Sequence, residues 1–329
     1  MNQVPANNEI EQYKYFVESC ALIQLDSMGV LSAKGADVLD LIDRLSTNDI
    51  NNLEDNSWID TVLTTNKGRI VAQIRLLKFS NKLLILSEKN ILSEIIEWID
   101  FYTFSEEVEF ENISENISVF ALIGPKAETV AKKITNLSNT TSDIGTSIST
   151  SFDEKDMILN FDQIADIPRI DLVLDKDLNE QFISRLKKQD IYQLTPETYN
   201  VFRIENRLPV HGSELNDKYN PLEANLLSNI SFNKGCYVGQ EVVARLNAYD
   251  KVRMQLVFLY IDKNCNPEKD MIITSDSNQI GALTSFEFSF VVDKWVALAY
   301  IKNRIVLMKT NFLLKMKKEN SNARLEILD

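Results

Sequence analysis

Residues 234–241 read KGCYVGQE, and the chain continues as VVARL to residue 246. Two glycines four positions apart bracket Cys236 and Tyr237, which indicates tight turns or a close approach of a ligand to the backbone. Lys234 precedes Cys236 by two residues and Arg245 follows it by nine, so these cations would favour a thiolate if the fold brings them close. Free cysteine is also among the most buried residue types, and this segment taken alone favours a buried Cys236.

The composition is that of a globular protein with more than one domain. The chain has 329 residues, of which 44% are apolar and 25% are charged, and this length predicts two or three domains. Its net charge of −13 disfavours non-specific binding to nucleic acid or to an anionic membrane. We therefore expect no stable nucleic-acid partner and no membrane partner.

Cysteine and histidine are scarce, which excludes several kinds of site. The three cysteines, Cys20, Cys236 and Cys265, form no CxxC pair, so neither a disulfide scaffold nor a self-contained zinc site is expected. His211 is the only histidine, which excludes multi-histidine metal centres and leaves no Ser/His/Asp triad unless His211 serves in it. The first residues have no basic segment followed by an apolar one, and no apolar run is long enough to span a membrane. These features predict a cytoplasmic protein.

The pattern of the first 115 residues predicts an α+β layer. Strands are expected at 21–25 and 30–31, separated by a turn at 26–29, and again at 58–64, 70–79 and 82–86. Asn66-Lys67-Gly68 between two of them is a hairpin signal. Two helices are expected because apolar residues recur at helical spacing, with Ser87 as the cap of the second; the residues are Val38, Leu41, Ile42, Leu45, Leu92, Ile95, Ile96 and Ile99.

A second unit with similar element types follows. Strands are expected at 119–123, 157–161 and 170–174, helices at 127–134 and 182–186, and a loop or weak edge strand at 136–151. Thr195-Pro196 begins a helix that carries Arg203 and Glu205, and PLEANLL at 221–227 reads as a short amphipathic helix. Strands at 252–261, 271–274, 280–286, 291–301 and 305–308 then predict a small C-terminal β-barrel.

KGCYVGQE resembles the signature of the YgfZ family of folate-binding proteins, which is related to the glycine-cleavage T-protein (aminomethyltransferase) and includes factors for tRNA modification and iron-sulfur cluster maturation. The motif residues are Lys234, Gly235, Cys236, Tyr237, Gly239, Gln240, Glu241 and Arg245. The same resemblance extends along the chain to LSTNDI (45–50), TTNKGRI (64–70), ALIGPKA (121–127), FRIENRLPV (202–210) and PLEANLL (221–227).

The resemblance implies an α+β fold of three domains arranged as a ring around a central channel for tetrahydrofolate or a derivative. The implied domains are 1–115 with 195–241, then 116–194, and a C-terminal β-barrel at 242–329. The resemblance also implies that Glu205, with Arg203, binds the pterin ring, because one carboxylate can accept two N–H bonds from an aminopyrimidine edge. Asn48 and Asp49 are weaker candidates for lining this channel, since they could equally well end the preceding helix.

One departure from the related enzymes bears on catalysis. Aminomethyltransferases carry paired aspartates after the turn that here reads KGRI, and this chain has Ala72 and Gln73 instead. Neither residue can act as a general base or stabilise a developing positive charge. Whether the chain is an enzyme therefore stays open, but a standard aminomethyltransferase is not expected.

The resulting hypothesis is an accessory protein that binds tetrahydrofolate and supports assembly or repair of iron-sulfur clusters in client enzymes, including tRNA-thiolating ones. Cys236 would be the reactive residue, and because one cysteine cannot hold a cluster, it would be a ligand shared with a scaffold or client protein. The alternatives are a folate-dependent one-carbon transferase of unknown substrate and a scaffold whose folate pocket is vestigial.

Overall fold

The computed structural model describes residues 13, 16–80, 82–135, 137, 143–249, 251–275, 278–306, 313–315 and 322–324. The chain divides into two compact units. The first unit comprises residues 1–63, 72–195 and 233–237, and the second comprises 64–71, 196–232 and 238–329. KGCYVGQE is thus divided between them, because its first four residues belong to the first unit and its last four to the second. The three-domain division implied by the resemblance stays a prediction.

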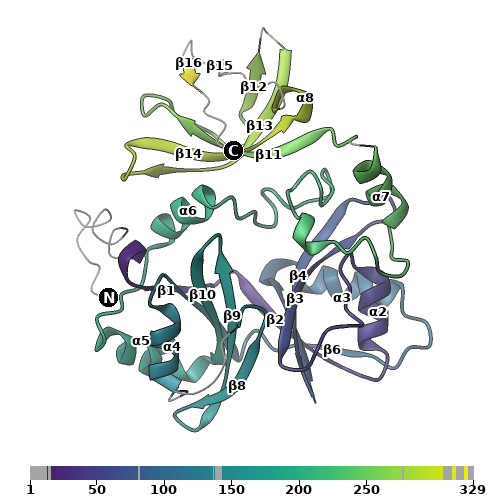
Figure 1. Ribbon diagram of the computed structural model, residues 1–329, viewed down its shortest axis with the longest axis vertical. Coiled ribbons are helices and arrows are strands. Elements are labelled where there is room, and N and C mark those ends of the chain that lie inside the picture. Colours follow the sequence, from purple (N-terminus) through teal and green to yellow (C-terminus); the bar gives the residue numbers. More distant parts are fainter. Residues whose placement is uncertain are drawn as a thin grey trace. The chain divides into compact units, whose positions relative to one another are not determined.

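The first unit is built on two five-stranded sheets (Figure 1). One sheet has the order β1-β7-β10-β9-β8, with β1 at Ala21–Gln24, β7 at Ile117–Ile123, β10 at Ile167–Asp175, β9 at Lys155–Ile164 and β8 at Ser147–Phe152. The other has the order β3-β4-β5-β2-β6, with β3 at Ser57–Thr64, β4 at Ile70–Phe79, β5 at Lys82–Glu88, β2 at Met28–Lys34 and β6 at Glu109–Asn112. The described pairs within both sheets are antiparallel, with Leu22 opposite Leu122 and Val30 opposite Leu86 as examples of the register.

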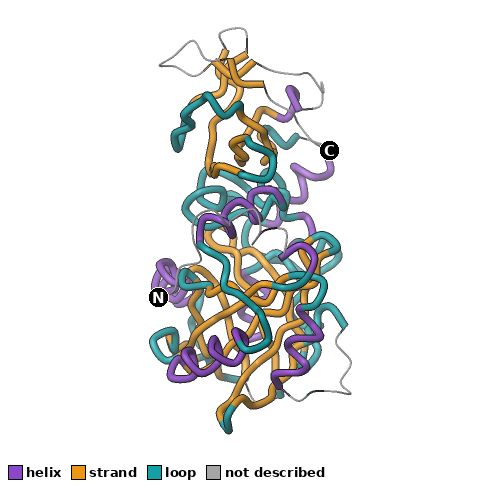
Figure 2. The backbone as a smooth tube through the Cα atoms, turned by 90° about the vertical axis from the view of Figure 1, so that its left-hand side faces the viewer, coloured by secondary structure: helices purple, strands orange, loops and turns teal. Residues whose placement is uncertain are grey.

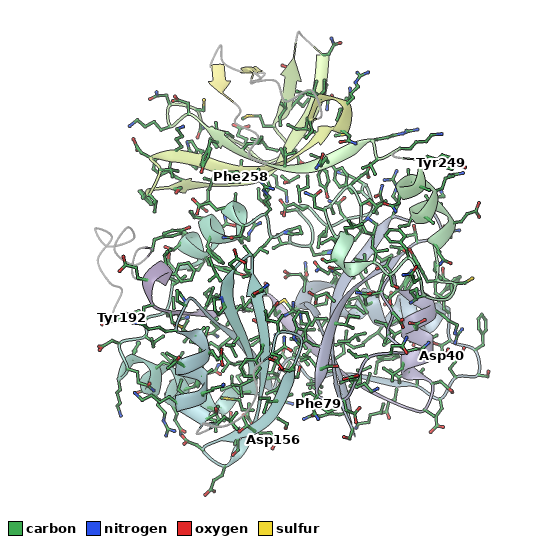
Figure 3. All side chains as sticks on the ribbon, viewed as in Figure 1. Asp40, Phe79, Asp156, Tyr192, Tyr249 and Phe258 are labelled. Atoms are coloured by element: carbon green, nitrogen blue, oxygen red, sulfur yellow. The ribbon has the colours of Figure 1, made fainter. Side chains whose placement is uncertain are left out.

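Apolar side chains join the two sheets face to face. Phe79 of β4 lies in this joint core with residues of both sheets, namely Val30, Leu77, Leu84, Leu86, Val119, Ile158 and Val173 (Figure 3). The alternation of β4 explains the joint, because every second side chain of a strand points to the same face of its sheet. Arg75, Leu77 and Phe79 of β4 therefore face the other sheet.

Helices cover the first unit's sheets from outside (Figure 2). Helices α4 (Ala127–Thr135) and α5 (Asn179–Lys187) pack onto the β1-β7-β10-β9-β8 sheet through a core that includes Phe120, Phe161 and Phe182. Helix α2 (Val38–Leu45) buries Val38, Leu41, Ile42 and Leu45, and α3 (Leu92–Phe101) buries Leu92, Ile95 and Ile99. Both helices were predicted from this apolar spacing, and these buried faces confirm it.

The second unit contains the C-terminal sheet. Its order is β11-β14-β13-β12, with β11 at Met254–Ile261, β14 at Lys294–Lys302, β13 at Asn278–Ser289 and β12 at Ile272–Ser275. Helix α6 (Pro196–Glu205) packs against β13 and β14, and α7 (Gln240–Ala248) and the short α8 (Asn303–Val306) also belong to this unit. A further described pair joins β15 (Leu313–Lys315) to β16 (Asn322–Arg324). The predicted α+β class, with two mixed layers and a C-terminal antiparallel sheet, is confirmed.

Several local predictions were wrong. Ser87 lies in β5 and its hydroxyl donates to the Gln73 carbonyl oxygen (2.8 Å), so it does not cap α3. Residues 221–225 form turns, followed by a 3-10 turn at Leu227–Asn229, because Asn225 adopts a left-handed conformation (φ 59°) that stops a helix. Residues 305–306 belong to α8 rather than to a strand, and residues 307–308 lie outside the described part.

Two further differences concern strand and helix placement. The strand predicted at 30–31 begins at Met28, and it belongs to a different sheet from β1. The mostly β pattern expected beyond residue 242 begins only after α7. That helix was missed because its only buried residue is Val243, so the sequence has no apolar stripe of helical period there. Within the described residues, the structure has no helix of sufficient length and apolarity to traverse a bilayer.

Candidate functional site

Lys234 fixes the first half of the motif to the loop after α2. Its ammonium donates to the carbonyl oxygens of Asp43 (2.6 Å), Asn48 (2.6 Å) and Ser46 (3.0 Å), and it lies 3.0 Å from Asp43 Oδ1. The Lys234 side chain is 1% exposed, so the charge is removed from water and held by the oxygens that end the helix. Burial lowers the pKa of Lys234, an effect that Asp43 opposes.

Cys236 is exposed, two residues beyond this buried anchor. The other two cysteines, Cys20 and Cys265, are buried, and burial raises the pKa of the Cys20 thiol to about 12. Gly235 has open space where a Cβ would be placed and no positive φ, so the fold does not require glycine there. The interpretation of Cys236 as a buried apolar residue was wrong, because the next side chain, Tyr237, is the one that packs inward.

The second half of the motif packs on the β3–β4 hairpin within the second unit. Gly239 has φ 86°, and a Cβ there would lie 2.4 Å from the Thr65 carbonyl oxygen. Thr64 Oγ1 donates to the Val238 carbonyl oxygen (2.5 Å), which ties the motif to the hairpin strand. Gly68, also left-handed at φ 66°, lies against Val242 and Val243 of α7. Gly239 therefore supplies both the turn and the close approach that glycine alone permits.

The last motif residues form the start of α7. Gln240 and Glu241 occupy its first turn, and Arg245 is an exposed residue of its last turn. Cys236 belongs to the first unit and Arg245 to the second, so their proximity stays a prediction. The ammonium of Lys234, the cation two residues before Cys236, contacts the Asp43 carboxylate and the carbonyl oxygens of Asp43, Ser46 and Asn48.

Asn48 and Asp49 form hydrogen bonds within the loop after α2, to which Lys234 also binds. Asn48 Nδ2 donates to the Asp60 carbonyl oxygen (2.9 Å), and Asn48 Oδ1 accepts from the Asp49 backbone N–H (3.0 Å). Asp49 Oδ2 accepts from Asn52 Nδ2 (2.7 Å), which closes a local turn. These bonds hold the loop that follows α2, whose C-cap is Ser46, and the contact of Asn48 and Asp49 with folate stays a prediction.

Glu205 and Arg203 lie near the end of α6 in different surroundings. Glu205 is half-buried, and its Oε1 accepts from Ser289 Oγ (3.2 Å). The Arg203 guanidinium is buried, donates to Ser285 Oγ (2.9 Å) and lies 3.6 Å from the fully buried carboxylate of Glu214. This geometry gives Arg203 a role in packing α6 onto β13, and leaves Glu205 as the stronger candidate for a ligand contact.

Ala72 and Gln73 lie on opposite faces of β4. Ala72 is fully buried and Gln73 is half-buried. A carboxylate at the position of Ala72 would be buried, and burying a carboxylate costs several kcal/mol by order of magnitude unless a cation or hydrogen-bond donors accompany it. The chain thus carries no acid–base group at either of the two positions.

Two features of the structure were missed from the sequence. Asp43 is a buried carboxylate that accepts from the Ile50 backbone N–H (2.7 Å) and receives Lys234, yet in the sequence it is only one polar residue of an amphipathic helix. Arg75 of β4 contacts carboxylates of Asp60 (2.7 Å), Asp162 (2.8 Å) and Asp171 (3.0 Å). An arginine within a mostly apolar strand was the available signal for this cluster.

Comparisons with known proteins agree with this architecture. Residues 5–159 match the GCVT N-terminal domain, and residues 254–327 match the glycine cleavage T-protein C-terminal barrel domain. Aminomethyltransferases of Caldanaerobacter subterraneus and Thermotoga maritima are 26% and 25% identical, over 90% and 88% of this chain and 80% of each relative. A chloroplastic transferase candidate of Arabidopsis thaliana is 26% identical over 91% of this chain and 69% of its own length.

A solved structure extends the agreement to the whole chain. The crystal structure of glycine cleavage system aminomethyltransferase T from Bartonella henselae superimposes with a TM-score of 0.84 at 14% identity, covering 100% of this chain and 90% of that one. At this identity the likeness concerns the fold alone. Both domain models and this superposition lead to one conclusion: the chain has the fold of the glycine cleavage T-protein family.

Proposed function

We propose that this chain is a YgfZ-like accessory protein that binds tetrahydrofolate, or a derivative, and supports assembly or repair of iron-sulfur clusters in client enzymes. The observation that carries the proposal is the exposure of Cys236 on a loop that Lys234 anchors through a buried ammonium. An anchored loop presents the thiol to another molecule in a defined position, which suits transfer to or from a partner. Clients that thiolate tRNA fall within this proposal.

Folate binding rests on the fold and on the chemistry of Glu205. Its carboxylate is half-buried and is held at one oxygen by Ser289. A carboxylate oxygen can accept more than one hydrogen bond, so Glu205 fits the paired N–H donors of an aminopyrimidine edge. The placement of tetrahydrofolate in a central channel between domains is part of the same proposal.

A cluster held through Cys236 would need ligands from a partner. Among the residues that the structure describes, no group of three or more His, Cys, Asp or Glu side chains could hold a metal ion. Iron-sulfur clusters are held by several thiolates, and Cys236 supplies one. We therefore propose that any cluster is shared with a scaffold or client protein and is transient on this chain.

A folate-dependent one-carbon transferase is the second candidate function. It is favoured by the relatives of about 25% identity that are named aminomethyltransferase or transferase. The buried Ala72 argues against the same chemistry here, because the position lacks a carboxylate. Conversion of tetrahydrofolate to its methylene form by aminomethyl donors, which supply carbon at the oxidation level of formaldehyde and release ammonia, would support this candidate. No turnover over a broad panel of such donors would count against it.

Calorimetry with tetrahydrofolate tests the binding part of the proposal. The native chain should bind, and Glu205→Gln should weaken binding by about 10- to 100-fold, as expected for loss of hydrogen bonds to a charged group worth about 1.5–3 kcal/mol. Glu197→Gln removes an exposed carboxylate from the same helix and is the matched control. Absence of both heat and a thermal shift at saturating folate would favour a scaffold with a vestigial pocket.

Complementation tests the role of Cys236. Cys236→Ser should leave the melting temperature unchanged, because the side chain is exposed, and should abolish rescue of iron-sulfur enzyme activity in a strain that lacks the protein. Gly235→Ala is the control in the same loop, since open space surrounds its Cβ position, and it should rescue fully. Full rescue by Cys236→Ser would exclude this role of the thiol.

A further inference from the structure

The end of α3 exposes aromatic side chains that a globular protein normally buries. Phe101 is 74% exposed and Phe104 is 88% exposed. Their neighbours Trp98 and Tyr102 are half-buried, and the Tyr102 ring lies 5.0 Å from the ring centroids of both Trp98 and Phe101. The rings of Trp98, Tyr102 and Phe101 thus form a cluster, and Phe104 follows it two residues after Tyr102. These four residues are called here the aromatic surface. Exposed aromatic clusters of this kind mark interaction sites.

Hydrogen bonds hold the aromatic surface in a defined conformation. Thr103 Oγ1 donates to the Ile99 carbonyl oxygen (3.0 Å), which secures the end of the helix. Glu106 Oε2 accepts from the backbone N–H groups of Phe104 (2.8 Å) and Ser105 (3.0 Å). These bonds, the one from Phe104 first, lower the pKa of Glu106 to about 2, with Arg44 adding to the effect. Because the segment is already ordered, a partner would not have to order it on binding.

Negative charge surrounds the aromatic surface. Between residues 92 and 112 the sequence has seven carboxylates and no lysine or arginine. Six of them are exposed, namely Glu94, Glu97, Asp100, Glu107, Glu109 and Glu111. The seventh, Glu106, forms an ion pair with Arg44 (Nη2 to Oε1, 2.8 Å). Exposed cations from other elements also lie near this acidic rim, since Lys34 of β2 stands opposite Glu109 and Arg44 contacts Glu106. The rim is therefore predominantly negative, and apolar rings within it suit a basic partner.

Helix α2 connects this surface to the loop of Cys236. Two consecutive residues of α2 form ion pairs with the two segments. Asp43 pairs with Lys234 of the Cys236 loop, and Arg44 pairs with Glu106 beside the aromatic surface. A second tie is the Glu107 backbone N–H, which donates to Asp37 Oδ2 (2.8 Å) just before α2. The exposed thiol and the aromatic surface are therefore anchored on the same short helix of the first unit.

We propose that the aromatic surface is the docking site for a partner protein that presents an apolar side chain flanked by lysine or arginine residues. Charge decides between occupants. A second copy of this chain, an anionic membrane and a nucleic acid would each bring negative charge to a negative rim. A basic partner gains ion pairs with the rim and cation–π contacts with the exposed rings. The partner would be the client of the proposed function, docked on the helix that anchors the Cys236 loop; the docking itself does not depend on that function.

Binding of synthetic peptides to the full chain tests the proposal. Three labelled 15-residue peptides are compared by fluorescence anisotropy: one with leucine and tryptophan flanked by arginine and lysine, one with serine at its apolar positions, and one with glutamate at its basic positions. The first should bind at least tenfold more tightly than the other two. Phe101→Ser/Phe104→Ser should lose at least tenfold in affinity, and Glu97→Gln/Glu107→Gln should lose about as much at low salt and less at high salt.

Matched variants separate the surface from general charge and stickiness. Phe290→Ser removes a 52% exposed ring from the second unit, and Glu180→Gln/Glu268→Gln removes two exposed charges elsewhere. Both controls should bind as the native chain does, with unchanged melting temperatures for all variants. Equal losses in the controls, or native affinity in Phe101→Ser/Phe104→Ser, would overturn the proposal. So would a dimer, or binding to anionic vesicles, that the Phe101→Ser/Phe104→Ser change abolishes.

The same variants keep this inference distinct from the proposed function. Cys236→Ser should bind the basic peptide as the native chain does, because the thiol is outside the surface. Phe101→Ser/Phe104→Ser should keep tetrahydrofolate binding and lose rescue in the deletion strain. Full rescue by Cys236→Ser together with peptide binding that depends on Phe101 and Phe104 would reject the role of the thiol and retain the docking site.

Discussion

Lys234 shows at the residue scale how the motif is held. Its ammonium makes four short contacts with oxygens of Asp43, Ser46 and Asn48. These residues lie in the last turn of α2 and in the loop that follows it. The carbonyl oxygens at the end of a helix lack partners within the helix, so a buried cation there satisfies them and opposes the helix dipole. The same bonds fix the backbone of the next two residues, and so the position of Cys236.

Replacing Lys234 should lower the stability of the protein. Lys234→Met leaves the carboxylate of Asp43 buried without its cation, and we expect a loss of about 3–5 kcal/mol in the free energy of unfolding. Urea denaturation measures it. Lys67→Met, at an exposed hairpin residue, is the control and should change stability by less than about 0.5 kcal/mol. Equal midpoints for the two variants would contradict the anchoring role.

Tyr237 should make stability depend on pH in the alkaline range. Burial raises the pKa of Tyr237 from 10.0 to about 12. A raised pKa means that the folded state keeps its proton when the unfolded state loses it, so this stability is complete below pH 10 and is lost between pH 10 and 12. The native chain should therefore lose about 1 kcal/mol more than Tyr237→Phe between pH 9 and 11, as measured by urea denaturation. Parallel stability profiles would contradict the assignment.

Two elements meet at Gly239, where the start of α7 packs against the β3–β4 hairpin. The turn of the hairpin contains Gly68, and α7 begins directly after Gly239. Each glycine lies against the other element, Gly68 against Val242 and Gly239 against the Thr65 carbonyl oxygen. Glycine is required at position 239 because two backbones approach each other closely there. Gly235 has no such neighbour.

The two motif glycines should respond differently to the same change. Gly239→Ala forces a left-handed alanine and a Cβ at 2.4 Å from the Thr65 carbonyl oxygen, for an expected loss of about 2–4 kcal/mol. Gly235→Ala should stay within about 0.5 kcal/mol of the native chain. Thermal unfolding followed by circular dichroism compares them. A similar melting temperature for both variants would show that the hairpin contact is unimportant.

At the scale of the whole molecule, the two sheets of the first unit are held together by ion pairs as well as by the apolar core between them. Arg75 extends from β4 and contacts Asp162 of β9 and Asp171 of β10, which belong to the other sheet. The Trp58 ring lies 3.9 Å from the Arg75 guanidinium carbon, and Trp58 Nε1 donates to the Phe161 carbonyl oxygen (2.9 Å). Nearby carboxylates raise the pKa of Arg75 against the opposing effect of burial, which keeps the guanidinium charged.

Removing Arg75 should lower the free energy of unfolding more than removing an exposed arginine. Arg75→Met removes the cation that Asp60, Asp162 and Asp171 share, while Arg169 stays 2.6 Å from Asp171, and the expected loss is about 3–5 kcal/mol. Arg44→Met removes an arginine whose side chain is 44% exposed, and should cost about 1 kcal/mol or less. Urea midpoints measure both. A loss at Arg75 no larger than that at Arg44 would show that the apolar core alone joins the sheets.

Elements with a strong local signal were predictable. The helix at 38–45 and the hairpin at 66–68 are encoded by residues a few positions apart, and both were found. Helix α7 was missed because a single buried residue, Val243, leaves no period to detect. The short helix predicted at 221–227 was wrong because Asn225 turns the chain, and apolar spacing does not reveal a left-handed residue.

The sequence by itself determined the fold class, the motif and the acidic, aromatic character of residues 92–112. Only the tertiary structure decided which motif residue is buried and which is exposed. Lys234 meets Asp43 across 191 positions, and Arg75 meets Asp171 across 96, distances at which no periodicity links two residues. Local patterns specify elements because the backbone repeats every few residues, whereas the partners of a buried charge depend on how distant elements pack. For that reason the segment around Cys236, taken alone, favoured a buried thiol, whereas the structure has this side chain exposed.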